Sequence, residues 1–200
     1  LSDPAPHPIL AQAQSMSIEE KDGAIYFGES RKYNKRGVTV VVLKGEPYEL
    51  GYARGALLKP EIQSWVRDGL YMIKRYAMGT SLGDTLMTNR AKEIEKYIPQ
   101  EQVEEIRGLS AGSGVKYEAL LVMNVIDTIA FGLRCTSIAV RCADGKIIRS
   151  RNFDEQIRPI FSSWILVITQ PAQGNAFASV SLPGLLGVIT AMNNKKVTFG

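Results

Sequence analysis

The chain has 200 residues, 45% of them hydrophobic, and a formal net charge of +4. That length and composition are enough to bury the core of one domain. The excess positive charge falls after residue 134 without a basic cluster or interleaved aromatic residues, which argues against a nucleic-acid interface. No run of 18 apolar residues occurs, so no membrane-spanning helix is expected.

The only histidine, His7, lies in a proline-rich opening segment. Cys-His and Ser-His dyads need a histidine in the core, and zinc sites with three histidines need several. The sequence therefore excludes these kinds of site, and any nucleophile in this chain needs another base.

The first residue is Leu1 rather than methionine, which suggests a trimmed signal peptide or an engineered start. No Asn-x-Ser/Thr acceptor for glycosylation occurs. Bacterial export, to the periplasm or outside the cell, is the simplest expectation, with a cytoplasmic location as the alternative. Residues 1–22 are expected to form a flexible tail.

Hydrophobic periodicity predicts a helix-rich first part and a strand-rich second part. Strands are expected at 23–27 and 37–44, joined by a polar segment at 29–36. A long helix or broken pair follows at 47–78, then helices at 82–97, from Pro99 to the glycines at 108–114, and at 117–131. Further strands are expected at 163–170, 176–182 and 186–191. This order predicts an α+β fold with helices covering a mostly antiparallel sheet. The chain is therefore expected to divide into the tail, a helix-rich part at 23–134 and a β-rich part at 135–200.

Two β-branched runs flank Asp144-Gly145, which is a strong hairpin signal. With those two residues as the loop, Cys135 would face Asp154, with Cβ atoms about 4.5–5.5 Å apart. Side chains alternate along a strand, so Arg151 would then point away from Cys135. For Arg151 and Asp154 to converge on Cys135, the second strand must bulge or end near Asn152.

Each of these residues also has an ordinary interpretation. Cys135 would be a small buried hydrophobe, as free cysteines usually are. Arg151 and Asp154 would form a surface ion pair worth about 0–1 kcal/mol, and Asn152 would be a turn residue. Cys142 lies seven residues from Cys135 on the same predicted strand, hence on the opposite face, so no disulfide is expected.

The segment Gly108-Leu-Ser-Ala-Gly112 matches the G-x-S-x-G pattern of serine hydrolases. That motif requires a preceding strand and a following helix. Residues 100–107 are instead glutamate-rich and typical of a helix, and no histidine follows. A glycine-terminated helix is the favoured interpretation.

One combination of features resembles the start of the catalytic subunit of N-terminal nucleophile hydrolases. It consists of the Cys135-Thr-Ser-Ile segment, the hairpin and the Arg151-Asn152-x-Asp154 segment. The pattern is similar to that of acid ceramidase and N-acylethanolamine acid amidase. Choloylglycine hydrolases and penicillin acyltransferase share the cysteine, an arginine 16 residues on and an aspartate 19 residues on. Further similar segments are Tyr48-x-x-Gly51-x-x-x-Gly55, Ile106 to Gly112 followed by Leu121-x-x-Asn124, and Pro183 to Asn193.

The resemblance implies a four-layer αββα fold made as an inactive precursor, without a cofactor or metal. Cleavage between Arg134 and Cys135 would make Cys135 the new N-terminus. A free α-amino group has a reference pKa of about 7.7–8.0, so it can accept the thiol proton near neutral pH. Cys135 would thus supply both nucleophile and base.

The resemblance also implies the roles of neighbouring residues. Asp154 would orient the α-amine, and Arg151 would favour the thiolate and hold the substrate or oxyanion. Four residues, together with Leu185 and Ile189, are candidates for an acyl pocket, each with plain core packing as the alternative: Phe131, Trp164, Met192 and Asn193.

The implied activity is hydrolysis of linear, non-peptide amides, with an N-acyl amine or a lipid-like small molecule as substrate. An acyltransferase using the same thioester is one alternative. Another is a non-catalytic or truncated relative that binds acyl ligands or a partner chain. Members of the family carry further asparagines for the oxyanion hole beyond the position equivalent to Gly200, so a fragment or a reduced protein is expected. The sequence does not indicate an oligomeric state.

Overall fold

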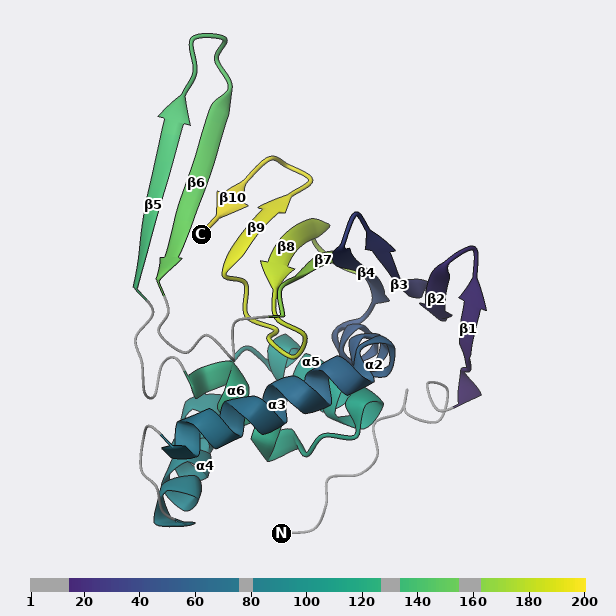
Figure 1. Ribbon diagram of the computed structural model, residues 1–200, viewed down its shortest axis with the longest axis vertical. Coiled ribbons are helices and arrows are strands. Elements are labelled where there is room, and N and C mark those ends of the chain that lie inside the picture. The colour runs from purple at the N-terminus through teal and green to yellow at the C-terminus, as the bar shows by residue number, and fades with distance from the viewer. Residues whose placement is uncertain (1–14, 76–80, 127–133, 155–162) are drawn as a thin grey trace.

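The computed structural model describes residues 15–75, 81–126, 134–154 and 163–200. In this part of the chain, a layer of helices lies beneath an eight-stranded sheet, and a separate two-stranded hairpin rises beside the sheet (Figure 1). The sheet has the order β1-β2-β3-β4-β7-β8-β9-β10. Its strands are β1 Ile18–Lys21, β2 Ala24–Phe27, β3 Ser30–Lys35, β4 Val38–Gly45, β7 Ile165–Pro171, β8 Phe177–Ser181, β9 Thr190–Asn193 and β10 Thr198–Phe199.

The sheet consists of two antiparallel halves joined by one parallel pair. Strands β1 to β4 form an antiparallel meander, and β7 to β10 form another. Strands β4 and β7 pair in parallel at the centre, with Val41 beside Val167. The predicted α+β class and the mostly antiparallel sheet are therefore confirmed, and the sheet is mixed.

Five helices are described. The predicted 47–78 segment is a broken pair, because Leu58 leaves the helical conformation (φ −119°, ψ 22°). Pro99 stands at the N-cap position rather than at the first helical residue, which corrects the predicted start of the third segment. The helices are α2 Pro47–Leu57, α3 Lys59–Ile73, α4 Ser81–Glu95, α5 Gln100–Ser113 and α6 Tyr117–Ile126.

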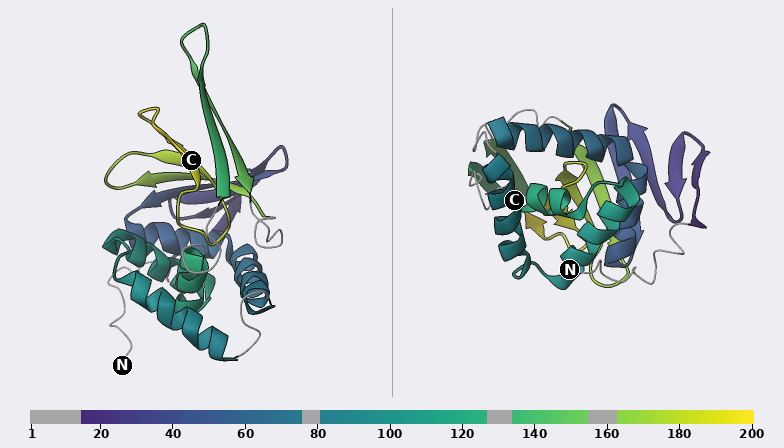
Figure 2. Two further views of the ribbon diagram at one scale, coloured as in Figure 1. Left: turned by 90° about the vertical axis from the view of Figure 1, so that its left-hand side faces the viewer. Right: turned by 90° about the horizontal axis from the view of Figure 1, so that it is seen from below.

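The helices cover one face of the sheet, and the hairpin extends on the opposite side (Figure 2). Val41, Leu43 and Val167 of the central strands are almost fully buried in the same apolar cluster as helix residues such as Leu58 and Ile62. Along β7, buried positions alternate with half-buried ones, as expected for a strand with one face on the core.

Helices α2 and α5 cross at backbone contact. A Cβ atom built on Gly51 would lie 1.9 Å from the carbonyl oxygen of Glu105, and one on Gly108 would lie 2.0 Å from that of Tyr48. Only glycine fits at such a crossing. The G-x-S-x-G segment thus lies inside α5, with Ser110 donating a hydrogen bond to the Val115 carbonyl at 2.6 Å. The helix interpretation is confirmed, and its end is Gly114 in the left-handed conformation (φ 72°).

Several predicted boundaries are wrong. Strand β1 pairs with β2, so ordered structure begins within the predicted tail. Strand β3 occupies most of the predicted polar connection at 29–36, because it pairs on both sides and needs few apolar residues. The predicted strand at 186–191 begins only at Thr190, since the preceding loop is held by helix side chains instead. Residues 127–131 of the predicted fourth helix lie outside the described residues.

Candidate active site at the base of the β5–β6 hairpin

The predicted hairpin is present, with a register one residue away from the predicted one. Strands β5 Arg134–Arg141 and β6 Ile147–Asp154 pair antiparallel over eight residue pairs. Cys135 faces Phe153 across the ladder, and Asp154 pairs with Arg134. The expectation that Cys135 lies on a strand antiparallel to the one holding Arg151 is confirmed, and the Cys135–Asp154 pairing is wrong.

The loop explains the shift. The Cys142 amide donates to the Lys146 carbonyl at 2.8 Å, and the Gly145 amide donates to the Cys142 carbonyl at 2.9 Å. Gly145 has a φ of 84°. These contacts describe a three-residue loop ending in a left-handed glycine, rather than the two-residue loop that was predicted. One extra loop residue moves every pair along the ladder by one position.

The new register brings Arg151 to the thiol without a bulge. Arg151 lies two residues from Phe153, hence on the same face of the hairpin as Cys135, in a diagonal position that long side chains reach. Its Nη2 donates a hydrogen bond to the Cys135 Sγ at 2.6 Å. Pairing is continuous from Arg134 to Arg141, so the predicted bulge is not needed for Arg151.

The guanidinium of Arg151 is held on several sides. Its Nη1 donates to the Ile189 carbonyl and, at 3.1 Å, to the Thr190 hydroxyl. Its central carbon lies 5.2 Å from the ring centroid of Phe153. Its Nε is buried and makes no hydrogen bond. A fixed cation in contact with a thiol favours the thiolate, which is the nucleophilic form.

A second set of contacts on the same face joins the hairpin to β10. Arg149 donates to the carbonyls of Thr198, at 3.0 Å, and of Gly200. Ser137 donates to the same Gly200 carbonyl at 3.2 Å. The Cys135 face of the hairpin is therefore oriented toward the β9–β10 end of the large sheet by polar side chains.

Cys135 is exposed and Cys142 is half-buried, and both thiols are free. The interpretation of Cys135 as a buried hydrophobe is therefore wrong. The absence of a disulfide between the two cysteines is as expected from their spacing.

An aromatic pair lies beside the thiol. Phe153, opposite Cys135, packs edge-to-face against Trp164, with ring centroids 5.4 Å apart. Trp164 is 38% exposed. Among the predicted pocket residues that the structure describes, Trp164 packs against the residue facing Cys135. Sequence reasoning missed Phe153, which the correct hairpin register would have placed opposite Cys135. It also missed Thr190 as a partner of Arg151, because that contact joins the hairpin to β9 and no local signal reports it.

The other predicted pocket residues are placed differently. The Asn193 side chain accepts hydrogen bonds from the amides of Lys195 and Val197, so it closes the β9–β10 turn rather than lining a pocket. Met192 is 54% exposed and lies two residues beyond Thr190 on β9. Leu185 packs against the core, and Ile189 contributes its carbonyl to Arg151. Phe131 and the side chains of Arg134 and Asp154 lie outside the described residues.

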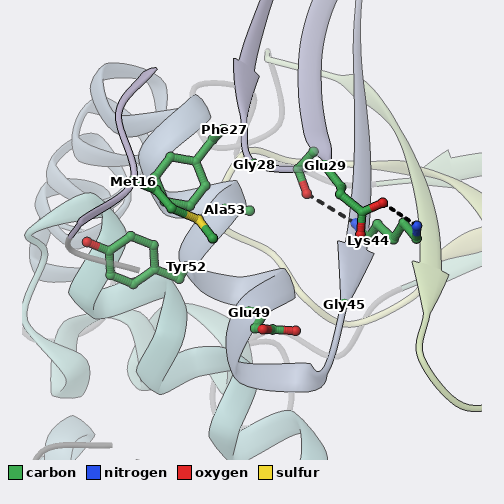
Figure 3. Close-up of a pocket in the computed structure, with 10 residues that line it drawn as sticks. Met16, Phe27, Gly28, Glu29, Lys44, Gly45, Glu49, Tyr52 and Ala53 are labelled. Carbon is green, nitrogen blue, oxygen red and sulfur yellow. Dashed lines mark hydrogen bonds and ion pairs between the residues drawn. The ribbon is translucent and has the colours of Figure 1, made fainter. Parts of the chain in front are cut away.

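A cavity of about 190 Å³ lies elsewhere, between the β2–β3 turn and the start of α2 (Figure 3). Phe27 and Tyr52 stack at its apolar side, with ring centroids 5.5 Å apart, and the Glu29–Lys44 ion pair lies at its polar side. It contains no hairpin residue and none of the predicted site residues, so it is separate from the Cys135 site.

Within the described ranges, no group of three histidine, cysteine or acidic residues is arranged to hold a metal ion. In the same part of the chain, no helix is both long and apolar enough to cross a membrane.

No family model matches the chain. Among curated proteins, it is 31% identical over 198 residues to an uncharacterised protein of Archaeoglobus fulgidus, covering 82% of this chain and 32% of that protein. It is 35% identical over 71 residues to the N-acylethanolamine-hydrolyzing acid amidase of Caenorhabditis elegans, covering 32% of this chain and 20% of that protein. It is 24% identical over 185 residues to protein dcd1A of Dictyostelium discoideum, covering 76% and 42%.

The chain thus spans less than half the length of each of these relatives. Its similarity to the amidase is distant and covers only part of the chain. Of these three proteins, the acid amidase is the one whose name states an activity, so the partial similarity to it is what supports a distant relationship to an amidase.

Proposed function

We propose that this chain carries the nucleophile of a cysteine amidohydrolase of the N-terminal nucleophile type. The observation that carries the proposal is the hydrogen bond from Arg151 to the Cys135 sulfur at the base of the hairpin. This pair of residues, 16 positions apart, has the spacing on which the resemblance to these enzymes rests. The partial similarity to an N-acylethanolamine-hydrolyzing acid amidase supports the same class of reaction.

In this proposal the large sheet and the hairpin belong to the two sheets of an αββα sandwich. The helices on one side of the large sheet and the hairpin on its other side are consistent with that arrangement (Figure 2). The proposed cleavage bond, between Arg134 and Cys135, follows the first residue of β5. Cleavage there would remove one residue pair from the ladder and leave the hairpin otherwise intact.

The proposed reaction starts at the α-amine of Cys135 released by cleavage. The amine accepts the thiol proton, and the sulfur attacks the substrate carbonyl carbon. The C–N bond breaks as the α-ammonium returns the proton to the leaving nitrogen, which leaves a thioester on Cys135. Water then gives a proton to the amine and attacks the thioester, so the C–S bond breaks and the free acid and the thiol are restored.

Arg151 and Asp154 have separate proposed roles. Arg151 would favour the thiolate through the contact already present. Asp154, at the end of β6, would accept a hydrogen bond from the α-ammonium and fix its direction. In the precursor, the same thiol would attack the Arg134 carbonyl, and the C–N bond to Cys135 would break as the α-nitrogen takes up the thiol proton. Water would then hydrolyse the resulting thioester, which releases the Arg134 carboxylate and restores the thiol of the new N-terminal Cys135.

The proposed substrates are linear, non-peptide amides with an apolar acyl group. The aromatic surface of Phe153 and Trp164 next to the thiol supports an apolar acyl group. An acyltransferase would use the same thioester with an amine in place of water.

Intact mass measurement under denaturing conditions tests the proposal first. A processed chain yields two fragments that separate between Arg134 and Cys135. A fluorogenic acyl-amide then tests turnover, and a hydroxylamine trap distinguishes the thioester from simple binding. An unprocessed chain that binds the acyl-amide without turnover would favour a non-catalytic acyl-binding protein instead.

A further inference from the structure

A buried arginine and a half-buried asparagine from different helices hold the loop that precedes β9. The loop runs from Leu182 to Leu186, between β8 and β9. Arg54 of α2 is only 3% exposed and donates from Nε to the Pro183 carbonyl at 2.9 Å and from Nη2 to the Leu182 carbonyl at 2.7 Å. It also donates to the Ser181 hydroxyl at 3.2 Å.

Asn124 of α6 holds the other half of the loop. Its Nδ2 donates to the Gly184 carbonyl at 3.0 Å, and its Oδ1 accepts from the Leu186 amide at 2.8 Å. Between these contacts the loop presses against α3, because a Cβ atom on Gly184 would lie 2.6 Å from two ring atoms of Trp65. Three helices therefore fix the loop from three directions.

The loop delivers the groups that hold Arg151. Ile189 and Thr190 follow three and four residues after Leu186, and both accept hydrogen bonds from Nη1 of Arg151. The other end of the same planar guanidinium contacts the Cys135 sulfur. A shift of the loop would turn the guanidinium as one rigid unit and move Nη2 relative to the sulfur.

The chemistry of Arg54 indicates that its hydrogen bonds to the 182–186 loop do more than stabilise the fold. Burying a guanidinium carries a desolvation cost of several kcal/mol that hydrogen bonds repay only when their geometry is good. Burial lowers the pKa of Arg54 to about 10, so it remains charged at neutral pH. Its fork matches carbonyls of adjacent residues, which is a way of fixing the backbone rather than of filling space.

We infer that Arg54 and Asn124 are positioning residues for Cys135, acting through the 182–186 loop and Arg151. This inference rests on the proposed role of Cys135 as nucleophile. Neither residue touches the sulfur. Their effect is to keep Arg151 in the position that favours the thiolate.

The test is the rate of Cys135 alkylation by iodoacetamide in the folded, full chain. Trypsin cuts after Arg134, Arg141 and Lys146, so Cys135 and Cys142 fall on different peptides and Cys142 serves as an internal control. In the wild type, we expect iodoacetamide to alkylate Cys135 faster than Cys142 at pH 7, because the guanidinium in contact with the Cys135 sulfur favours the thiolate. Asn124→Asp replaces the donor to Gly184 with an oxygen, and Arg54→Lys removes the fork.

Both variants are expected to slow alkylation of Cys135 at pH 7 by about 3–10-fold, in line with a weaker contact between Arg151 and the sulfur, with Cys142 unchanged. Val103→Ala, in the buried face of α5 away from the loop, is the matched control for a general loss of stability. Thr190→Val removes the hydroxyl acceptor of Arg151 and gives a second variant if the helix substitutions do not fold.

Variants that lower the melting temperature as Val103→Ala does, while keeping the wild-type alkylation profile at Cys135, would overturn the inference. If the variants slow the alkylation of Cys135 but the wild-type protein has no amidase activity, the proposed function alone would be overturned. The two ideas therefore fail separately.

Discussion

The α2–α5 crossing and the β5–β6 hairpin are held in the fold by different kinds of contact. At the crossing, glycines bring two backbones into contact, so there is no room for a side chain. On the hairpin, Ile138, Val140 and Ile148 are 53–60% exposed on the face opposite Cys135. The hairpin is joined to the large sheet by polar contacts of Ser137, Arg149 and Arg151 instead.

This difference suggests a division of roles. Substitutions at the crossing should act on the free energy of unfolding, because close packing does not tolerate added volume. Substitutions at the base of the hairpin should act on chemistry, because the side chains there are exposed and few apolar contacts depend on them.

The largest expected effect comes from the nucleophile. Cys135→Ala should abolish both cleavage after Arg134 and amidase turnover, while changing the free energy of unfolding by less than about 0.5 kcal/mol. Cys142→Ala is the control, because this cysteine lies at the hairpin turn. Intact mass and steady-state kinetics measure the two activities. Equal loss in both variants would mean that no single thiol is the nucleophile.

Asp154→Asn should lower turnover by about 10²–10⁴, the usual range for a general acid–base contribution, with a smaller effect on KM. The amide keeps the shape of the carboxylate and loses its charge, so it orients the α-ammonium less well. His7→Ala is the control and should leave the pH–rate profile unchanged, since no role is assigned to the only histidine. Normal turnover in Asp154→Asn would contradict the proposed base.

The difference between crossing and hairpin also predicts two unequal glycine substitutions. Gly108→Ala places a methyl group 2.0 Å from the Tyr48 carbonyl oxygen, so α2 and α5 must separate at a cost of about 3 kcal/mol or more. Gly145→Ala meets nothing within 4 Å and only has to adopt a φ of 84°, at about 1–2 kcal/mol. Urea denaturation of both variants measures these costs. Similar costs would contradict the role assigned to the crossing.

The same two regions show what the sequence could and could not predict. The helices and the hairpin follow from local periodicity and from the Asp144-Gly145 signal, and their presence is confirmed. The hairpin register depends on whether the loop has two or three residues, and both loops are compatible with the same residues. The error of one position moved Arg151 to the wrong face and made a bulge appear necessary.

Two further features could not be predicted from the sequence because they depend on long-range contacts. Strand β3 is polar, and it is a strand because it pairs with β2 and β4. The strand predicted at 186–191 begins only at Thr190. The loop before it has carbonyls that accept hydrogen bonds from Arg54 and Asn124, at least 60 positions away in the sequence. Local propensity does not report such partners.

The last expected effect depends on pH and concerns the carboxyl of Glu105, beside the crossing. Burial raises the pKa of Glu105 from 4.5 to about 7, and the positive charge of Arg54 opposes the rise. A carboxyl with a raised pKa in the folded state stabilises the fold fully below about pH 4.5, and this contribution is lost as the pH rises through about 7. Each pH unit between the two pKa values corresponds to about 1.4 kcal/mol. The contribution of Glu105 to the free energy of unfolding is therefore bounded at about 3 kcal/mol.

Glu105→Gln stays uncharged throughout this range. Its free energy of unfolding, minus that of the wild type, should therefore increase between pH 4.5 and 8, because only the wild type then has to ionise a buried carboxyl. Urea titrations at pH 4.5, 6 and 8 measure the difference, and Glu101→Gln, at an exposed position in the first turn of the same helix, is the control. If Glu105→Gln is instead less stable than the wild type at pH 8, the expectation is contradicted. The attraction between the ionised carboxylate and Arg54 would then outweigh the cost of burying the charge.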